Sequence, residues 1–194
     1  MIDPLYVFVA LGLFTPGPNV ILLTASGARF GLRASVPHIL GVAAGVGIIA
    51  GLTGFGIGAV LASLPMVEWV LSVLAAGWIG WMAWTLWQAR PATPAEAPGA
   101  RPFTFLQAVL FQWVNPKLWA VALAAASGYA ADLAPVAEAQ RLAIAFSATN
   151  LAVCLFWTAT GTGLARLLTT PRAWRGFTRT MALGLAASAV MVFW

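Results

Sequence analysis

The stretch that decides the fold is Pro4–Ala28, with the sequence PLYVFVALGLFTPGPNVILLTASGA. It contains no charged side chain, and it is longer than the roughly 20 apolar residues that a helix needs to cross a bilayer. Further stretches with at most one charge follow along the chain: Ala34–Val67, Trp69–Ala89, Pro102–Ala131, Leu142–Ala165 and Thr180–Trp194. We therefore predict six membrane-spanning helices.

The composition supports this class. Of the 194 residues, 61% are hydrophobic and 8% are charged, whereas soluble domains carry about 25% charged residues. So few charges cannot cover a soluble surface, which predicts an all-α integral membrane protein. The single cysteine excludes an intramolecular disulfide and a thiolate metal cluster. One histidine and five acidic residues leave little material for a metal site, and we expect no metal and no other cofactor.

The charges indicate the orientation. The first, third and fifth predicted loops hold eight bases, and the second and fourth hold one. The eight are Arg29, Arg33, Arg90, Arg101, Arg166, Arg172, Arg175 and Arg179. Because Lys and Arg accumulate on the cytoplasmic side, both termini should lie outside. The bases sit in short loops and form no basic face, so nucleic acid is not an expected partner.

A linker divides the chain into similar halves. Residues 90–102 read RPATPAEAPGARP, a composition typical of a mobile connection. Residues 1–89 and 103–194 each contain three predicted spans, and an odd number means that the halves enter the membrane from opposite sides. We predict a single transmembrane domain, 1–194, made of two inverted three-helix repeats.

The first helix of each half is interrupted at a proline. The two motifs are TPGPN at Thr15, Pro16, Gly17, Pro18 and Asn19, and QWVNPK with Gln112, Asn115, Pro116 and Lys117. Each lies about 12–14 residues into its helix, or roughly 20 Å at 1.5 Å per residue, so both should reach the membrane midplane. Paired interruptions of this kind are a pointer to a transporter binding site.

The chemistry of such breaks suits an amino acid. A proline frees backbone carbonyls, and each new half-helix, with Asn115 as the N-cap of the second, aims its positive end inward. Lys117 adds a charge for a carboxylate, while freed carbonyls and the amides of Asn19 and Asn115 can hold an ammonium. The alternatives are prolines that kink helices for packing alone and a Lys117 that reaches the interface instead.

Three other features have two interpretations each. His38 either carries protons or is a polar anchor at the interface, and Asn150 either lines the cavity or bonds another helix. The glycines at 41, 45, 47, 51, 54 and 58 permit close helix contacts. Those contacts are by default internal, and the alternatives are a contact between the subunits of a homodimer and a sliding surface used in alternation. Cys154 is most simply a small apolar filler.

These motifs resemble a known family. TPGPN followed by a Gly-rich second span resembles the amino-acid exporters of the lysine and homoserine/homoserine-lactone (LysE/RhtB) type. The segments LAAGWIGWMAW at Leu74–Trp84 and QWVNPK at Gln112–Lys117 are similar to that family's third- and fourth-span patterns. Within the family, the RGFTR loop and the final FW look most like the cysteine/O-acetylserine exporter branch.

The resemblance implies a secondary transporter of the bacterial inner membrane that exports amino acids with the proton gradient and is not an enzyme. Carried over by position, its functional motifs are Pro16 to Asn19 and Asn115 to Lys117, with Lys117 a candidate for proton coupling. Many relatives have Asp where this chain has Asn19, so we expect neutral rather than cationic substrates. The competing hypothesis is a membrane scaffold that transports nothing.

Overall fold

A computed structural model describes residues 3–57, 64–89, 101–131 and 133–190. All regular structure within these residues is helical, as predicted. The helices are α1 (Pro4–Phe14), α2 (Pro18–Ala34), α3 (Val36–Gly54), α5 (Pro65–Trp87), α6 (Phe105–Trp113), α7 (Pro116–Gly128), α8 (Pro135–Ala165) and α9 (Pro171–Val190). Most of the predicted linker, residues 90–100, and Gly58 lie outside the described residues.

Proline and side-chain caps begin the helices. Six of the eight described helices start at a proline, which lacks the N–H that would go unbonded in the first turn. α6 starts instead with a capping box, in which the Gln107 N–H donates to the Thr104 hydroxyl and the Thr104 N–H donates to the Gln107 side chain. α1 is capped by the Asp3 carboxylate, which accepts from the Leu5 N–H at 2.9 Å.

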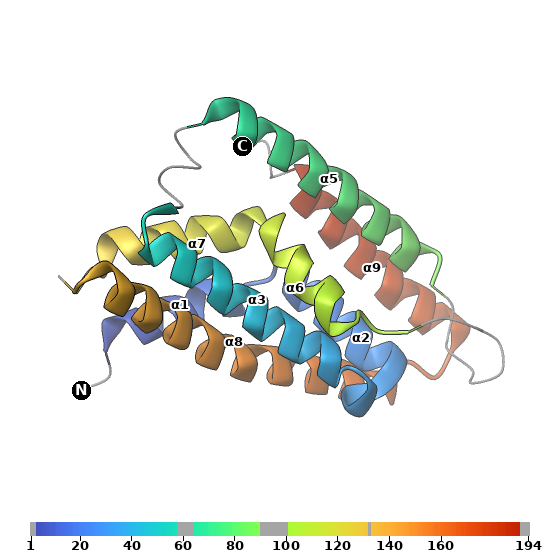
Figure 1. Ribbon diagram of the computed structural model, residues 1–194. Helices are drawn as coiled ribbons and strands as arrows, with labels where there is room; N and C mark the ends of the chain where they lie inside the picture. Colours follow the sequence, from blue (N-terminus) through green and yellow to red (C-terminus); the bar gives the residue numbers. More distant parts are fainter. Residues whose placement is uncertain (1–2, 58–63, 90–100, 132, 191–194) are drawn as a thin grey trace.

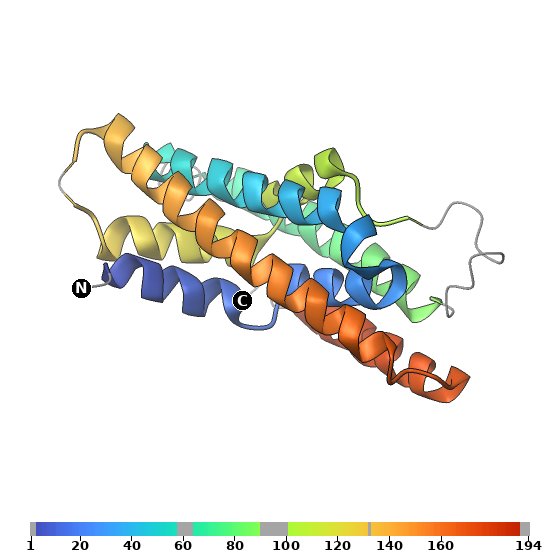
Figure 2. The same ribbon diagram turned by 90° about the horizontal axis from the view of Figure 1, so that it is seen from below.

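The longest helix organises the bundle. α8 packs along α1, α2 and α3, and α6 and α7 pack on α3 (Figure 1). α5 and α9 pack mainly on each other and form a pair at one side. A cluster of buried residues, including Ile21, Ile79, Phe111 and Leu185, joins this pair to α2 and α6. The bend between α1 and α2 and the length of α8 are plain from below (Figure 2).

The glycines of α3 serve two internal contacts. A Cβ at Gly41 would overlap the backbone of α6, and one at Gly45 would lie 2.6 Å from Gln112, which is also in α6. A Cβ at Gly47 would overlap Ser147 of α8, and one at Gly54 would lie 2.8 Å from the α8 backbone. The small residues of the predicted second span therefore let α3 lie close to α6 and α8.

A second close contact joins α2 to α8. A Cβ at Gly27 would overlap the Thr158 carbonyl oxygen, and a Cβ at Gly161 would overlap the Thr24 carbonyl oxygen. The Thr162 hydroxyl also donates to the Gly27 carbonyl at 3.1 Å. We call this contact the α2–α8 seam; its small residues let the two backbones approach closely.

Two described helices, α3 and α8, are each long and apolar enough to cross a membrane. α1 and α2, bent by 63° at their break, make a third candidate if they are counted as one span. The arrangement of six spans in two inverted repeats therefore stays a prediction.

Several bases that we assigned to loops lie in helices instead. Arg29 and Arg33 belong to α2, Arg141 to α8, and Arg172 and Arg175 to the first turns of α9. Arginine is a good helix former, so a run of arginines does not end a helix. The charges limit only how much of that helix can lie in the bilayer. The Thr170 hydroxyl supports the start of α9 by accepting from the Ala173 N–H at 3.1 Å.

Candidate functional site

Both proline motifs interrupt their helices. α1 ends at Phe14 and α2 begins at Pro18, while α6 ends at Trp113 and α7 begins at Pro116. At the first break, the exposed Thr15 hydroxyl turns back to its own helix and donates to the Gly12 carbonyl at 2.7 Å. It thereby satisfies a carbonyl at the end of α1, so the Thr15 side chain serves the helix terminus.

Amide side chains join the two breaks. Asn19 and Gln112 form a reciprocal pair, with Asn19 Nδ2 donating to Gln112 Oε1 at 2.8 Å and Gln112 Nε2 donating to Asn19 Oδ1 at 3.2 Å. Gln112 is fully buried and also donates to the Ala108 carbonyl at 3.0 Å. These residues are 93 positions apart, so the pair ties the first turn of α2 to the end of α6.

Lys117 makes a second link between the breaks. Its ammonium donates to the Thr15 carbonyl oxygen, which the end of α1 leaves available. The aliphatic part of the side chain passes Gly17, where a Cβ would lie 2.9 Å from Lys117 Cδ. Gly17 therefore makes room for the lysine, and the ammonium of Lys117 is directed to a backbone acceptor at the first break.

Asn115 occupies the N-cap position of α7, as predicted, but its side chain does not cap the helix. Its Nδ2 lies 3.5 Å from Gln112 Oε1, at the limit of a hydrogen bond. Its Oδ1 is buried without a partner among the described residues, and so is Nδ2 of Asn150 in α8. A free acceptor and a free donor are thus present at one site, where a polar ligand or water can satisfy both.

These groups line one small cavity between α1, α2, α7 and α8, which we call the central cavity. Its polar lining is Asn19, Asn115, Lys117 and Asn150, and its other lining residues are Leu13, Gly17, Pro18, Val20, Leu23, Leu118, Val153 and Cys154. Its volume is about 20 Å³, enough for about one water molecule. The cavity is therefore too small in this structure to hold an amino acid.

The cavity brings together some of the predicted site residues and leaves others aside. Pro16 and Pro116 shape the breaks without lining the cavity, and Gln112 acts through Asn19. His38 lies in a different cavity, beside Arg29. Sequence reasoning missed Val153 and Cys154 as wall residues, although Cys154 follows Asn150 by one helical turn and so shares its face.

Comparison with known proteins gives first the class and then the family. Residues 10–193 match the sequence model of a family of translocators, which are membrane transporters rather than enzymes. The family is that of the LysE type translocators, and the chain belongs to it. Membership supports an amino-acid exporter in general, and it implies a small-molecule substrate and contact with membrane lipids. No curated protein and no solved structure matches the chain.

Proposed function

We propose that the protein exports small neutral amino acids, or derivatives such as those of the cysteine/O-acetylserine type, across the bacterial inner membrane. The proton gradient drives the export, and two inverted three-helix repeats, residues 1–89 and 103–194, alternate around the central cavity. Both termini are external in this arrangement. Family membership supports export in general, and the cavity supports the substrate class.

The observation that carries the proposal is the set of groups at the cavity. Lys117 supplies a positive charge, and the first turns of α2 and α7 supply positive dipole ends beside it. Together they suit a carboxylate. The unpaired Asn115 Oδ1 is an acceptor for an ammonium. The described lining contains no carboxylate, which disfavours substrates with a cationic side chain.

In this mechanism the substrate carboxylate replaces the Thr15 carbonyl oxygen as the acceptor for the Lys117 ammonium. The lysine then exchanges a backbone acceptor for the substrate carboxylate, so binding does not leave a charged group unpaired. Asn150 also lines the cavity, and its unpaired Nδ2 donates to the substrate. Lys117 is also the candidate group for proton coupling, because it is the cavity's one ionisable cation among the described lining residues.

The test is transport by purified protein in liposomes with an imposed pH gradient and a mixture of labelled amino acids. Lys117→Met removes the charge and keeps the length of the side chain. Because a hydrogen bond to a charged group is worth about 1.5–3 kcal/mol, we expect substrate affinity to fall by about tenfold to a hundredfold. Asn19→Ala should also abolish efficient export.

Ser127→Ala is the matched control, since Ser127 is an exposed residue of the same helix, α7, whose hydroxyl bonds only to the Leu123 carbonyl among the described contacts. It should transport like the wild type. Wild-type export by folded Lys117→Met and Asn19→Ala would refute the assigned site.

The second candidate is a membrane scaffold that transports nothing, a role in which the glycines of α3 would form close contacts with a partner. Among the described glycines of α3, these contacts are made within the chain, so they supply no surface for a partner. Saturable, substrate-selective flux excludes the scaffold, whereas folded protein without flux of any amino acid under any gradient would favour it. A homodimer remains compatible with either function.

A further inference from the structure

Two further cavities, which adjoin each other, lie outside the central cavity. One, of about 200 Å³, lies between α2, α3, α5 and the segment 101–103 that leads into α6. The other, of about 540 Å³, lies between α5 and α6. The two share Trp81, Arg101, Pro102 and Phe103 as lining residues. Both are larger than the central cavity, and neither contains a residue of the proline motifs.

The smaller cavity, which we call the inner cavity, is rich in groups that can donate to an anion. It is lined by the cationic side chains Arg29 and Arg101 and by His38. His38 is only 2% exposed, and neither of its ring nitrogens has a partner among the described residues; the same holds for Arg29 Nε. The described lining contains no carboxylate. Buried donors without partners are costly, so an oxyanion that accepts from them would stabilise this region.

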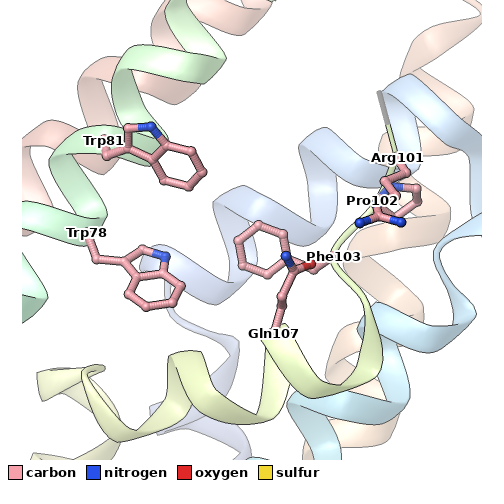
Figure 3. A pocket seen from close by; sticks show the side chains of 6 residues that line it. All are labelled: Trp78, Trp81, Arg101, Pro102, Phe103 and Gln107. Atoms are coloured by element: carbon pink, nitrogen blue, oxygen red, sulfur yellow. The ribbon is translucent and has the colours of Figure 1, made fainter. Parts of the chain in front are cut away.

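The larger cavity, which we call the outer cavity, has aromatic walls. Trp78 and Trp81 project from α5 towards Phe103 and Gln107, with Arg101 at one end of the gap (Figure 3). Trp81 is 59% exposed, and indole rings are common at the level of lipid headgroups. Aromatic walls give an inorganic anion no favourable contact, whereas acyl chains pack well against them.

The position in the fold agrees with this ligand. The cavities lie at the arginine-rich end of the bundle, where Arg179 packs over Trp87 at 4.8 Å. This end is the predicted cytoplasmic side. Basic pockets between helices on that side hold acidic lipid headgroups.

We propose that these cavities form a site for an anionic phospholipid. Its phosphate lies between Arg29, Arg101 and His38, and its acyl chains follow Trp78 and Trp81 along the gap between α5 and α6. The site is separate from the central cavity, and the inference does not depend on what the protein transports.

Native mass spectrometry of the detergent-purified protein tests the site, with dioleoyl phosphatidylglycerol and dioleoyl phosphatidylcholine as probes. We expect phosphatidylglycerol to bind in preference. Arg101→Gln and Arg29→Gln should each weaken its binding by about tenfold, as the loss of a charge-assisted hydrogen bond would. Arg33→Gln is the matched control, because Arg33 is exposed on α2 and lines neither cavity.

Quenching of tryptophan fluorescence locates the lipid independently of the arginine variants. Brominated phosphatidylglycerol should quench more than brominated phosphatidylcholine, and Trp78→Phe/Trp81→Phe should remove that difference. The proposal is overturned if the two lipids bind equally, if Arg101→Gln binds like Arg33→Gln, or if the double tryptophan variant keeps the difference. Displacement of the lipid by millimolar inorganic phosphate would assign the site to a free anion and equally overturn it.

Discussion

The reciprocal amide pair between Asn19 and Gln112 lends itself to a double-mutant cycle. It is the direct side-chain connection between the first turn of α2 and the end of α6, and it consists of two hydrogen bonds of 2.8 and 3.2 Å. The cycle comprises Asn19→Ala, Gln112→Ala and the double variant. We expect each single variant to lower the free energy of unfolding and the double variant to lose less than the sum.

The structure sets the magnitude. In Asn19→Ala, Gln112 Nε2 keeps its bond to Ala108 at 3.0 Å, but Gln112 Oε1 keeps only the 3.5 Å contact with Asn115. A buried acceptor left nearly unpaired costs about 1–3 kcal/mol. Hydrogen bonds between membrane helices average about 0.6 kcal/mol, with a maximum near 1.7, so two of them predict a coupling energy of about 1–2 kcal/mol.

The assay is reversible unfolding in mixed detergent, followed by circular dichroism, with the exposed Gln140 of α8 as control partner. Asn19→Ala combined with Gln140→Ala should be additive within about 0.5 kcal/mol. If Asn19→Ala and Gln112→Ala are equally additive, the two amides do not stabilise each other, and the central link between the proline motifs is refuted.

Three further predictions concern other parts of the fold. Gly161→Ala should lower the free energy of unfolding by about 1–3 kcal/mol, because its Cβ would overlap the Thr24 carbonyl across the α2–α8 seam; Gly163→Ala, with open space around it, should be neutral or stabilising in the same unfolding assay. His38→Phe should raise Tm in lipid-free detergent by about 2–4 °C, the shift for about 1 kcal/mol, because it removes two buried nitrogens without partners; an unchanged or lower Tm would contradict this. The Leu5 N–H, and then Arg141, lower the pKa of Asp3. The contribution of Asp3 to the stability of the fold is therefore present at neutral pH and is lost as the pH falls below about 4. The Tm should depend less on pH between pH 3 and 5 in Asp3→Asn than in the wild type, and an equal dependence would count against the ion pair.

Much of the fold follows from local chemistry that the sequence displays. The helix breaks at Pro18 and Pro116 could be predicted because proline acts on its own backbone and the preceding turn. The contacts of Gly41 and Gly47 were predicted as a class, since absent side chains permit close helices. Helix ends near Arg33 and Arg172 could not be predicted, because charge limits depth in lipid and not the length of a helix.

The candidate site was predictable in its polar members and not in its geometry. Asn19, Asn115 and Lys117 were candidates because polar side chains in membrane-spanning helices are costly, so they indicate a functional site. That Lys117 would select the Thr15 carbonyl, or that Gln112 would bond Asn19, depends on how α2 meets α6. Such partners are 93 or more residues apart, and a pattern along one helix carries no information about them.

The size of the central cavity bears on which helices move. A cavity of about 20 Å³ must grow before it can hold an amino acid. The α2–α8 seam and the contact of Gly41 with α6 join backbone to backbone, so α2, α3, α6 and α8 are poorly suited to separate. α1 and α7 are instead connected to these helices at the two breaks, and Gly12 of α1 packs on Val121 of α7. Because the breaks lack a continuous run of helical hydrogen bonds, we expect the alternation of the two halves to involve bending at the breaks, of α1 in the first half and of α7 in the second. The proline motifs would then act both as the binding groups and as the hinges that expose them.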